Sequence, residues 1–339
     1  MLPFFKFPLF PLLYFIQMWS LKEIINFSMV SKHSFYAVRF LLRYLSYCKP
    51  ITVTMDIYEN HHEITVFSDS EKCVVRVMNK KELEDAQSSQ QTFNGIQYLF
   101  VDKNEIVNTY WKDEDLALKM IYAHVRDLFG KPIDYLTYIP SKDNLHVDFL
   151  EAISNDQQNV ENCSIGAMFG LSGKDVGSIL NILQNTRNLN LSYTVLDYDL
   201  SGYKFHNLVI EDGERFPCQK LVKLDFESLD LYQLYDFDEC LKKEELNTFL
   251  RLWITGNLPR MKNFRLETVL SLPFPDVLKT INFEPSGKLL DIDEENTVLT
   301  GGPYNIRRLT DGKIATVYTL DYWNENGQQM TYFEFSVDE

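Results

Sequence analysis

The apolar stretch from Phe7 to Leu42 is the feature that most constrains what this chain can fold into. It is interrupted at residues 20–23 by the sequence S-L-K-E, which is the pattern of a helix capping box. In such a box the Ser20 hydroxyl accepts a hydrogen bond from the backbone N–H of Glu23, and the Glu23 carboxylate accepts one from the N–H of Ser20. Apolar residues recur three and four positions apart on both sides of a second serine, Ser31. This spacing predicts three short helices, over about 9–18, 21–29 and 32–45.

These three helices are too short and too apolar to be stable alone. Isolated helices of fewer than about 12–15 residues are marginal in water. The first segment also carries more large apolar side chains than so small a bundle can bury, namely those of Phe7, Leu9, Phe10, Leu12, Leu13, Phe15, Ile16, Met18 and Trp19. A surplus apolar face has to be covered, so the segment predicts a partner-binding site.

The order of elements in this segment resembles an F-box. An apolar residue and a proline precede an apolar helix, a capped helix ends in the sequence F-S-M-V-S-K at 27–32, and a third amphipathic helix follows. The resemblance implies an F-box over 4–48 that docks on the Skp-type adaptor, and through it on the cullin, of a ubiquitin ligase. The residues that it implies for adaptor contact are Pro8, Leu9, Leu12, Leu13, Ile16, Leu21, Ile24 and Ile25.

Two other interpretations of the apolar start stay open, a targeting segment and ordinary core helices of a larger domain. A secretory signal is disfavoured because no small-x-small cleavage site follows, and because Pro8 and Pro11 interrupt the apolar run. The run is also shorter than the roughly 20 residues that a membrane-spanning helix needs.

Composition narrows the class of protein further. The chain has 339 residues, enough for two or three domains, and its 33 basic against 48 acidic residues give a net charge of −15. Nonspecific binding to nucleic acid or to an anionic membrane needs a basic surface, so neither partner is expected. The five cysteines are scattered without a C-x-x-C pair, which favours a reducing intracellular compartment, cytoplasmic or nuclear.

After Pro50 the apolar period changes from helical to alternating, which predicts strands near 51–57, 64–66, 75–77 and 98–101. We expect a turn at 59–62 and an exposed loop at 80–91. Asp113 is expected to cap a helix with the apolar stripe Leu118, Ile121, Val125 and Leu128, and Gly130 is expected to end it. Residues 49–130 therefore form a β-rich segment plus one helix.

In the remainder of the chain, 131–339, short segments of the type Asn/Lys-apolar-x-apolar recur at 162–165, 188–191, 207–210, 220–224 and 262–266. Helical patterns at 175–186 and 242–253 lie between some of them. Strand–helix units of this kind predict an irregular leucine-rich-repeat-like α/β body. A turn at 301–304 and the hairpin dipeptides Asp311-Gly312 and Asn326-Gly327 predict antiparallel strands at the C-terminal end. The predicted fold class is thus mixed, α+β or α/β, with a three-helix F-box before this body.

The segment Leu241–Leu266 carries a second resemblance. Its pattern of Leu246, Phe249, Leu250 and Trp253, followed by Gly256, Pro259, Met261 and Phe264–Leu266, resembles the type-2 F-box-associated domain of the large nematode group of F-box proteins. The resemblance covers about 205–272. Any helix–turn–strand unit satisfies the same physical pattern, because Gly256 permits a left-handed cap and Pro259 stops the helix.

No catalytic, cofactor or metal motif is apparent in the sequence. Gly170–Asp175 resembles a phosphate-binding loop but lacks the first glycine and the final Ser/Thr, so a helix start explains it better. Adjacent histidines on a strand point to opposite faces, so His61 and His62 are assigned to a turn and to no metal. His124 is placed on a polar helix face with Arg126.

The sequence therefore predicts a non-catalytic substrate-recognition subunit of a Skp–cullin–F-box ubiquitin ligase. Its N-terminal helices would bind the adaptor and its body a protein target. The main alternative is a non-ligase interaction scaffold whose F-box-like helices cap its own body. An enzyme with an unrecognised pocket and a membrane-tethered protein are further alternatives.

Overall fold

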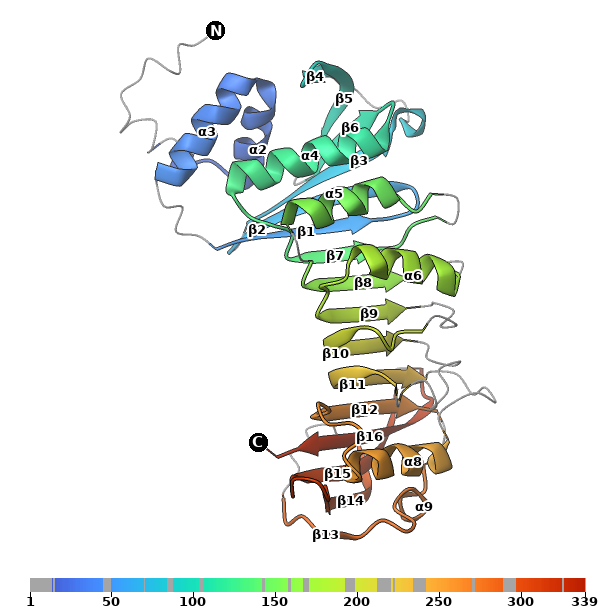
Figure 1. Cartoon of the computed structure of the whole chain (residues 1–339). Helices are drawn as coiled ribbons and strands as arrows, with labels where there is room; N and C mark the ends of the chain where they lie inside the picture. Colours follow the sequence, from blue (N-terminus) through green and yellow to red (C-terminus); the bar gives the residue numbers. More distant parts are fainter. Residues whose placement is uncertain are drawn as a thin grey trace. The chain divides into compact units, whose positions relative to one another are not determined.

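A computed structural model represents the protein in Figure 1. The structure describes residues 14, 16–44, 50–69, 71–83, 88–103, 106–141, 144–157, 160–166, 171–192, 199–211, 221, 223–233, 242–269, 272–288, 297–324 and 326–338. The chain divides into two compact units, unit 1 (Met1–Asn162) and unit 2 (Cys163–Glu339). The domain boundaries predicted from the sequence, 4–48, 49–130 and 131–339, stay predictions.

Unit 1 combines helices with a mixed sheet. Its strands follow the order β7-β1-β2-β3-β6-β5-β4, in which β1, β2 and β3 are antiparallel neighbours and β3 pairs parallel with β6. Its elements in chain order are α2 (Leu21–Val30), α3 (Lys32–Tyr44), β1 (Ile51–Ile57), β2 (His61–Ser68), β3 (Glu71–Asn79), the 3-10 helix η2 (Lys80–Glu82), β4 (Ser89–Phe93), β5 (Ile96–Lys103), β6 (Ile106–Trp111), α4 (Glu114–Phe129), β7 (Tyr135–Tyr138) and α5 (Val147–Gln157).

The helices of unit 1 pack on this sheet and on one another. Both α2 and α4 contact β2 and β3, α3 packs against α2 and α4, and α4 and α5 lie side by side (Figure 1). The capping box predicted at Ser20 is confirmed, because the Ser20 side chain accepts from the N–H of Glu23 and the Glu23 carboxylate accepts from the N–H of Ser20. The helix expected after Asp113 is confirmed as α4, and Gly130 ends it with φ of 66°.

Unit 2 is also a mixed sheet with helices. Its strand order is β13-β14-β15-β16-β12-β11-β10-β9-β8. Its elements in chain order are β8 (Asn162–Gly166), α6 (Gly173–Ile182), β9 (Asn188–Ser192), β10 (Lys204–Glu211), β11 (Asp225–Gln233), α8 (Lys243–Ile254), β12 (Asn263–Thr268), α9 (Phe274–Val277), β13 (Phe283–Pro285), β14 (Val298–Arg307), β15 (Ile314–Trp323) and β16 (Gln329–Val337).

Two kinds of pairing meet in the sheet of unit 2. Strands β9, β10, β11 and β12 are parallel, whereas β12 pairs antiparallel with β16, and the hairpins β14–β15 and β15–β16 continue the sheet from there. The dipeptides Asp311-Gly312 and Asn326-Gly327 lie between the paired strands, with φ of 76° at Gly312 and 71° at Gly327. Positive φ at these positions is what glycine permits in tight turns.

The fold class predicted from the sequence is wrong. The described residues form mixed sheets in which strand residues outnumber helical ones, and a separate N-terminal three-helix F-box is not seen. The reason is tertiary: α2 and α3 pack on each other and also onto β2, β3 and α4, so they are part of unit 1. Most of the first predicted helix, 9–18, lies outside the described residues. In a solenoid each repeat contacts its sequence neighbours, whereas β16 inserts beside β12 and ends the parallel run.

Three local predictions are also corrected. The expected turn at 59–62 ends earlier, because β2 starts at His61. In the expected strand at 220–224, the described residues Leu221, Lys223 and Leu224 lie outside any strand, and β11 starts at Asp225. The expected turn at 301–304 lies inside β14, where the pairing register with β15 shifts at two points. A glycine-rich irregularity within a strand has the same composition as a turn.

Gly256, after α8, provides a test of this packing. Its φ is 85°, and a Cβ built there would lie 2.5 Å from Cγ2 of Thr310. We expect Gly256→Ala to lower the free energy of unfolding of unit 2 by more than the roughly 1–2 kcal/mol that left-handed backbone costs an L-residue. Urea denaturation of the whole chain measures this loss.

The matched control is Gly312→Ala, because Gly312 has φ of 76° but no atom within 4 Å of the added Cβ. This variant should show the backbone cost alone. Equal losses in the two variants would contradict the close approach of Thr310 to Gly256.

Candidate functional site

The structure places half of the eight residues predicted for adaptor contact. Pro8, Leu9, Leu12 and Leu13 lie outside the described residues. The other four are almost completely buried in the core of unit 1: Ile16, Leu21, Ile24 and Ile25. A partner cannot reach these four side chains while the helices keep this packing. The adaptor role of all eight residues stays a prediction.

Other apolar side chains of the N-terminal helices do reach the surface. Met18 is 67% exposed and Phe40 is 56% exposed, and Val30 and Tyr36 are exposed to a similar degree. Tyr36 and Phe40 lie four residues apart on α3, so they share one helix face. We call Met18, Val30, Tyr36 and Phe40 the N-terminal exposed set. Val30 and Tyr36 also line one pocket, and neighbouring exposed apolar side chains are where a partner can bury surface.

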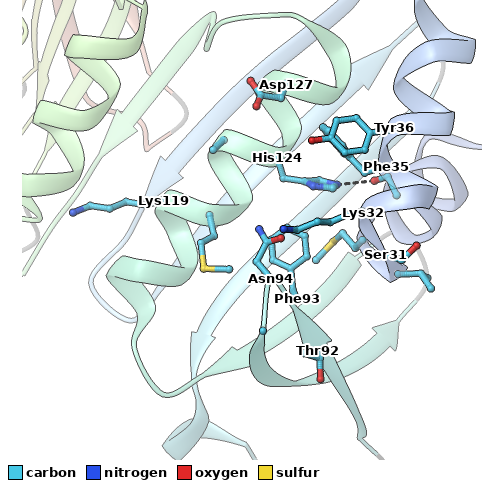
Figure 2. Close-up of a pocket in the computed structure, with 16 residues that line it drawn as sticks. Ser31, Lys32, Phe35, Tyr36, Thr92, Phe93, Asn94, Lys119, His124 and Asp127 are labelled. Atoms are coloured by element: carbon cyan, nitrogen blue, oxygen red, sulfur yellow. Dashed lines mark hydrogen bonds between the residues drawn. The ribbon is translucent and has the colours of Figure 1, made fainter.

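A pocket of about 730 Å³ opens between α2, α3, α4 and the turn that joins β4 to β5 (Figure 2). Val30 and Tyr36 of the N-terminal exposed set line it. Lys32 and Lys119 bring positive charge to it, and Asp127 brings negative charge. We call this cavity the N-terminal pocket.

His124 of α4 lies in the N-terminal pocket between two aromatic rings. Its ring centroid is 4.8 Å from that of Phe35 and 5.0 Å from that of Phe93. Its Nε2 is 2.7 Å from the hydroxyl of Ser28 (Figure 2). The expectation that His124 lies on a polar helix face is therefore wrong, because α3 and β4 cover that face.

The pairing of Ser28 with His124 does not have the geometry of a nucleophile and its base. The buried Ser28 hydroxyl donates its hydrogen to the carbonyl oxygen of Ile25 at 2.7 Å. His124 must therefore donate its Nε2 hydrogen to the hydroxyl oxygen, and it cannot also accept a proton from it. Burial lowers the pKa of His124 from 6.5 to about 4, so the ring is neutral near pH 7.

In unit 2 the apolar residues of the sequence pattern around α8 pack in the core. Its apolar members, Leu246, Phe249, Leu250, Trp253, Met261, Phe264 and Leu266, are all buried. The ring centroid of Phe249 lies 4.7 Å from that of Phe264, and that of Trp253 lies 4.9 Å from that of Phe335. These contacts fix α8 on β12 and β16, so the pattern residues form the scaffold beneath a surface.

A buried arginine completes this scaffold. The guanidinium carbon of Arg308 lies 5.2 Å from the ring centroid of Trp253, and Arg308 is 4% exposed. Its Nε and Nη2 donate to the two carboxylate oxygens of Asp311 at 2.8 and 2.5 Å, and its Nη1 donates to the carbonyl oxygen of Pro259 at 3.2 Å. The bidentate pair lowers the pKa of Asp311 to about 2.

A groove of about 670 Å³ opens at the end of α8. Three segments of unit 2 line it: the last turn of α8, residues 280–284 and residues 305–314. Leu309, which is 75% exposed, and Phe283 bring apolar surface to it. Arg251, Arg307 and Glu284 add charge. We call this cavity the C-terminal groove, and its mixture of apolar and charged side chains suits a peptide or protein surface.

Residues 202–266 match the sequence model of a family described as F-box associated. The match spans β10, β11, α8 and most of β12, and it confirms the F-box-associated domain expected over 205–272. A comparison with curated proteins and a comparison with solved structures gave no match for the chain. None of the described helices is both long and apolar enough to cross a bilayer.

The sequence pattern predicts the scaffold of the F-box-associated region but does not reveal the C-terminal groove. Arg251, Ile254 and Thr255 of the groove lie inside the matched segment, whereas its other lining residues follow it in the chain. One signal was available: Leu309 is an apolar residue just before the hairpin dipeptide Asp311-Gly312. A turn normally carries polar residues there, so an apolar one indicates a contact.

The neutral state of His124 predicts a pH dependence of stability. Between pH 6.5 and about 4 the unfolded chain binds a proton that the folded ring does not. The free energy of unfolding therefore falls as the pH decreases through this window. We expect His124→Gln to flatten this slope, measured by urea denaturation at several pH values.

The control is Ser28→Ala, which removes the hydrogen-bond partner and keeps the ring buried. Because burial is the main cause of the lowered pKa, this variant should keep the wild-type slope. An unchanged slope in His124→Gln would contradict the assignment.

Proposed function

We propose that this chain is a non-catalytic target-recognition subunit of a Skp–cullin–F-box-type E3 ubiquitin ligase, acting in the cytoplasm or nucleus. The observation that carries the proposal is the F-box-associated match at 202–266, which includes the helix that borders the C-terminal groove. Such a subunit does no chemistry itself. It holds a target lysine near a charged ubiquitin carrier, so catalysis comes from proximity.

The C-terminal groove is the surface that we assign to the target. Leu309 and Phe283 are exposed in its lining, and burying a large apolar side chain against a partner contributes about 1.5–3 kcal/mol. Arg251 and Arg307 add two positive charges, and Glu284 adds a negative one. A peptide segment with an apolar anchor flanked by charged residues complements this lining.

The N-terminal exposed set is the surface that we assign to the adaptor among the described residues. Its four apolar members lie on or beside α2 and α3, the helices whose sequence resembles an F-box. The buried members of the same helices, Leu21, Ile24 and Ile25, hold them on the sheet of unit 1. In this arrangement some apolar side chains of the two helices build the core, whereas Val30, Tyr36 and Phe40 are exposed.

The alternative, a non-ligase scaffold whose N-terminal helices cap its own body, also has support. Burial of Leu21, Ile24 and Ile25 against unit 1 is what a cap requires. Deleting residues 1–48 does not separate the two functions, because it would uncover β2 and β3 in either case. Substitution of exposed residues separates them, since it leaves the core of unit 1 intact.

The adaptor is tested by co-purification of the full chain with a Skp-type adaptor. Wild type should retain it, and Met18→Asp and Phe40→Asp should weaken binding about tenfold or more. Losing the burial of one large apolar side chain costs about 1.5–3 kcal/mol, and each 1.4 kcal/mol is about tenfold in affinity. The control is Leu309→Asp, an equally disruptive change on an exposed residue of unit 2.

The result would favour the scaffold function if the wild-type protein is folded, as judged by circular dichroism, but retains no adaptor. The same holds if Met18→Asp, Phe40→Asp and Leu309→Asp all bind the adaptor as wild type does.

The target surface is tested with Leu309→Asp and Phe283→Asp in the C-terminal groove, and Met18→Asp is the control. Proteins captured by wild type and by Met18→Asp, but lost from Leu309→Asp and Phe283→Asp, are expected to be targets. Their abundance should rise when this chain is depleted or when cullin activity is blocked, as measured by quantitative proteomics. Capture that is equal for all four proteins would exclude the C-terminal groove as the target site.

A further inference from the structure

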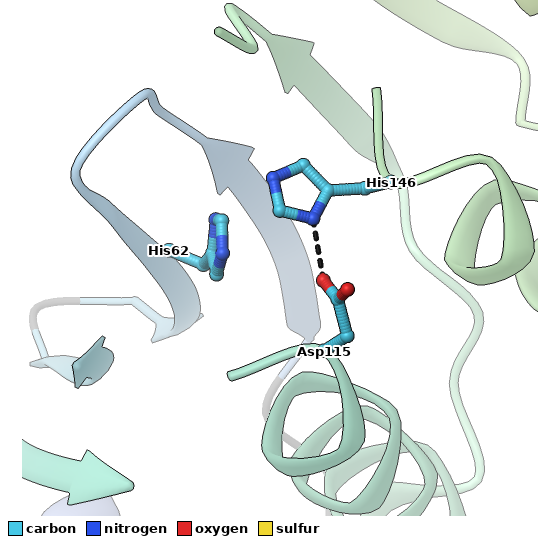
Figure 3. Close-up of side chains that lie close together, drawn as sticks. All are labelled: His62, Asp115 and His146. Atoms are coloured by element: carbon cyan, nitrogen blue, oxygen red, sulfur yellow. Dashed lines mark hydrogen bonds and ion pairs between the residues drawn. The ribbon is translucent and has the colours of Figure 1, made fainter. Parts of the chain in front are cut away.

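Three side chains that are distant in the sequence meet in unit 1 (Figure 3). His62 extends from β2, Asp115 lies in the first turn of α4, and His146 immediately precedes α5. One ligand atom from each of them lies within 4.8 Å of the other two. His62 was expected in a turn, whereas it lies in β2, and the sequence does not predict that it meets Asp115 and His146.

His62 is the decisive member because nothing in the described residues satisfies its ring. The residue is 1% exposed, and neither Nδ1 nor Nε2 has a hydrogen-bond partner. Buried polar groups are nearly always hydrogen-bonded. Figure 3 shows the ring directed into the space that it shares with Asp115 and His146. A lone pair on a buried, unpartnered imidazole nitrogen is available for a metal ion.

His146 is held in a fixed position. Its φ is 43°, a left-handed value that is uncommon for a residue with a side chain. Its backbone N–H donates to Oδ1 of Asn144 at 3.0 Å, and its carbonyl oxygen accepts from the N–H groups of Phe149 and Leu150. The ring is thereby fixed with Nδ1 2.5 Å from Oδ1 of Asp115 and its centroid 4.6 Å from that of His62.

Carboxylates complete the group. The Asp115 side chain is 46% exposed, so an ion and a water molecule can reach the buried histidines past it. Glu114, the preceding residue, places Oε2 4.0 Å from Nε2 of His62. Two imidazoles with one or two carboxylates form a donor set that suits Zn²⁺ and other divalent first-row metals.

We propose that His62, Asp115 and His146 bind a divalent transition-metal ion of the zinc type, with Glu114 or a water molecule in the fourth position. At bond lengths of about 2.1 Å, tetrahedral ligands lie about 3.4 Å apart. His62 therefore moves closer to the other two ligands, and the 2.5 Å contact between His146 and Asp115 opens. Side-chain rotation supplies both changes. The bound ion would link β2, α4 and the start of α5.

An ion pair between His146 and Asp115 without a metal explains fewer of the observed contacts than a metal ion does. It accounts for the contact between His146 and Asp115, but it leaves both nitrogens of His62 without a partner. A buried water molecule bridging the same polar groups would also satisfy His62, but it would give no Zn²⁺ binding at one equivalent, so the titration below separates the two. The metal uses all three side chains at once, and its binding would couple to the folding of unit 1.

The test uses the full chain, purified free of metal with a chelator. Zn²⁺ is added in a calorimetric titration, and Co²⁺ is added while visible absorption is recorded. We expect one equivalent of Zn²⁺ to bind, the midpoint of thermal unfolding to rise, and Co²⁺ to give the intense bands of a tetrahedral site. The absence of saturable binding at one equivalent would overturn the proposal.

Three variants place the ion. Asp115→Asn changes a half-exposed residue and leaves Asp113, the cap of α4, in place. His146→Asn keeps a residue type that tolerates positive φ. Each should weaken Zn²⁺ binding by at least about tenfold. The matched control, His61→Asn, changes the neighbouring histidine, which pairs with Glu63 instead, and should bind Zn²⁺ as wild type does.

Circular dichroism shows whether each variant is folded. The Zn²⁺ affinity of either folded ligand variant, Asp115→Asn or His146→Asn, is enough to test the site. Wild-type affinity in a folded Asp115→Asn or His146→Asn protein would overturn the site. So would an equal loss of affinity in His61→Asn.

Discussion

The contact of Trp253 with Phe335 and Arg308 is the interaction on which the architecture around the C-terminal groove depends. Trp253 ends the apolar stripe of α8, and its buried ring meets Phe335 of β16 edge-on and the Arg308 guanidinium. Arg308 is held by Asp311 and by the carbonyl of Pro259. The helix, the sheet and the β14–β15 hairpin are thereby joined at one point. A charge buried this deeply is tolerated because its hydrogen-bonding groups are paired.

The C-terminal groove is a consequence of this junction. The N–H of Leu309 donates to the carbonyl oxygen of Ile254 at 2.8 Å, which fixes the hairpin against the end of α8. Leu309 is exposed to solvent and lines the C-terminal groove together with Phe283. The buried pattern residues lie within the matched segment and set the shape of the scaffold. The exposed groove residues Leu309 and Phe283 follow that segment in the chain.

The N-terminal helices also carry both buried and exposed apolar residues, and this changes how their apolar sequence is interpreted. An apolar excess in 7–42 indicated a partner surface, but the structure uses Ile16, Leu21, Ile24 and Ile25 to attach α2 and its neighbours to unit 1. Among the described residues of this stretch, Met18 and Phe40 are exposed. Apolar composition alone cannot distinguish a face that packs inside its own chain from one that packs on a partner, because the hydrophobic effect drives both.

Several local structures could be predicted from the sequence. The capping box at Ser20, the Asp113 cap and Gly130 stop of α4, and the Gly256 turn all depend on residues within one or two helical turns of one another, and each is present. The predictions of turns were wrong where the same residue types occur both in turns and in strands. Glycines 301 and 302 lie in a strand with a shifted register instead of a turn, and His61 and His62 begin β2.

The sequence by itself determined the helix caps, the glycine turns and the F-box-associated pattern, because short-range hydrogen bonds and backbone sterics act between residues that are close in the chain. The tertiary structure alone decided the rest. It placed β16 beside β12, buried four of the residues expected to contact an adaptor (Ile16, Leu21, Ile24 and Ile25), and left Leu309 exposed. It also brought His62, Asp115 and His146 together from two helix starts and a strand. Contacts of this kind depend on how the sheet is ordered and on which faces are covered, and a periodicity of two or 3.6 residues does not encode either.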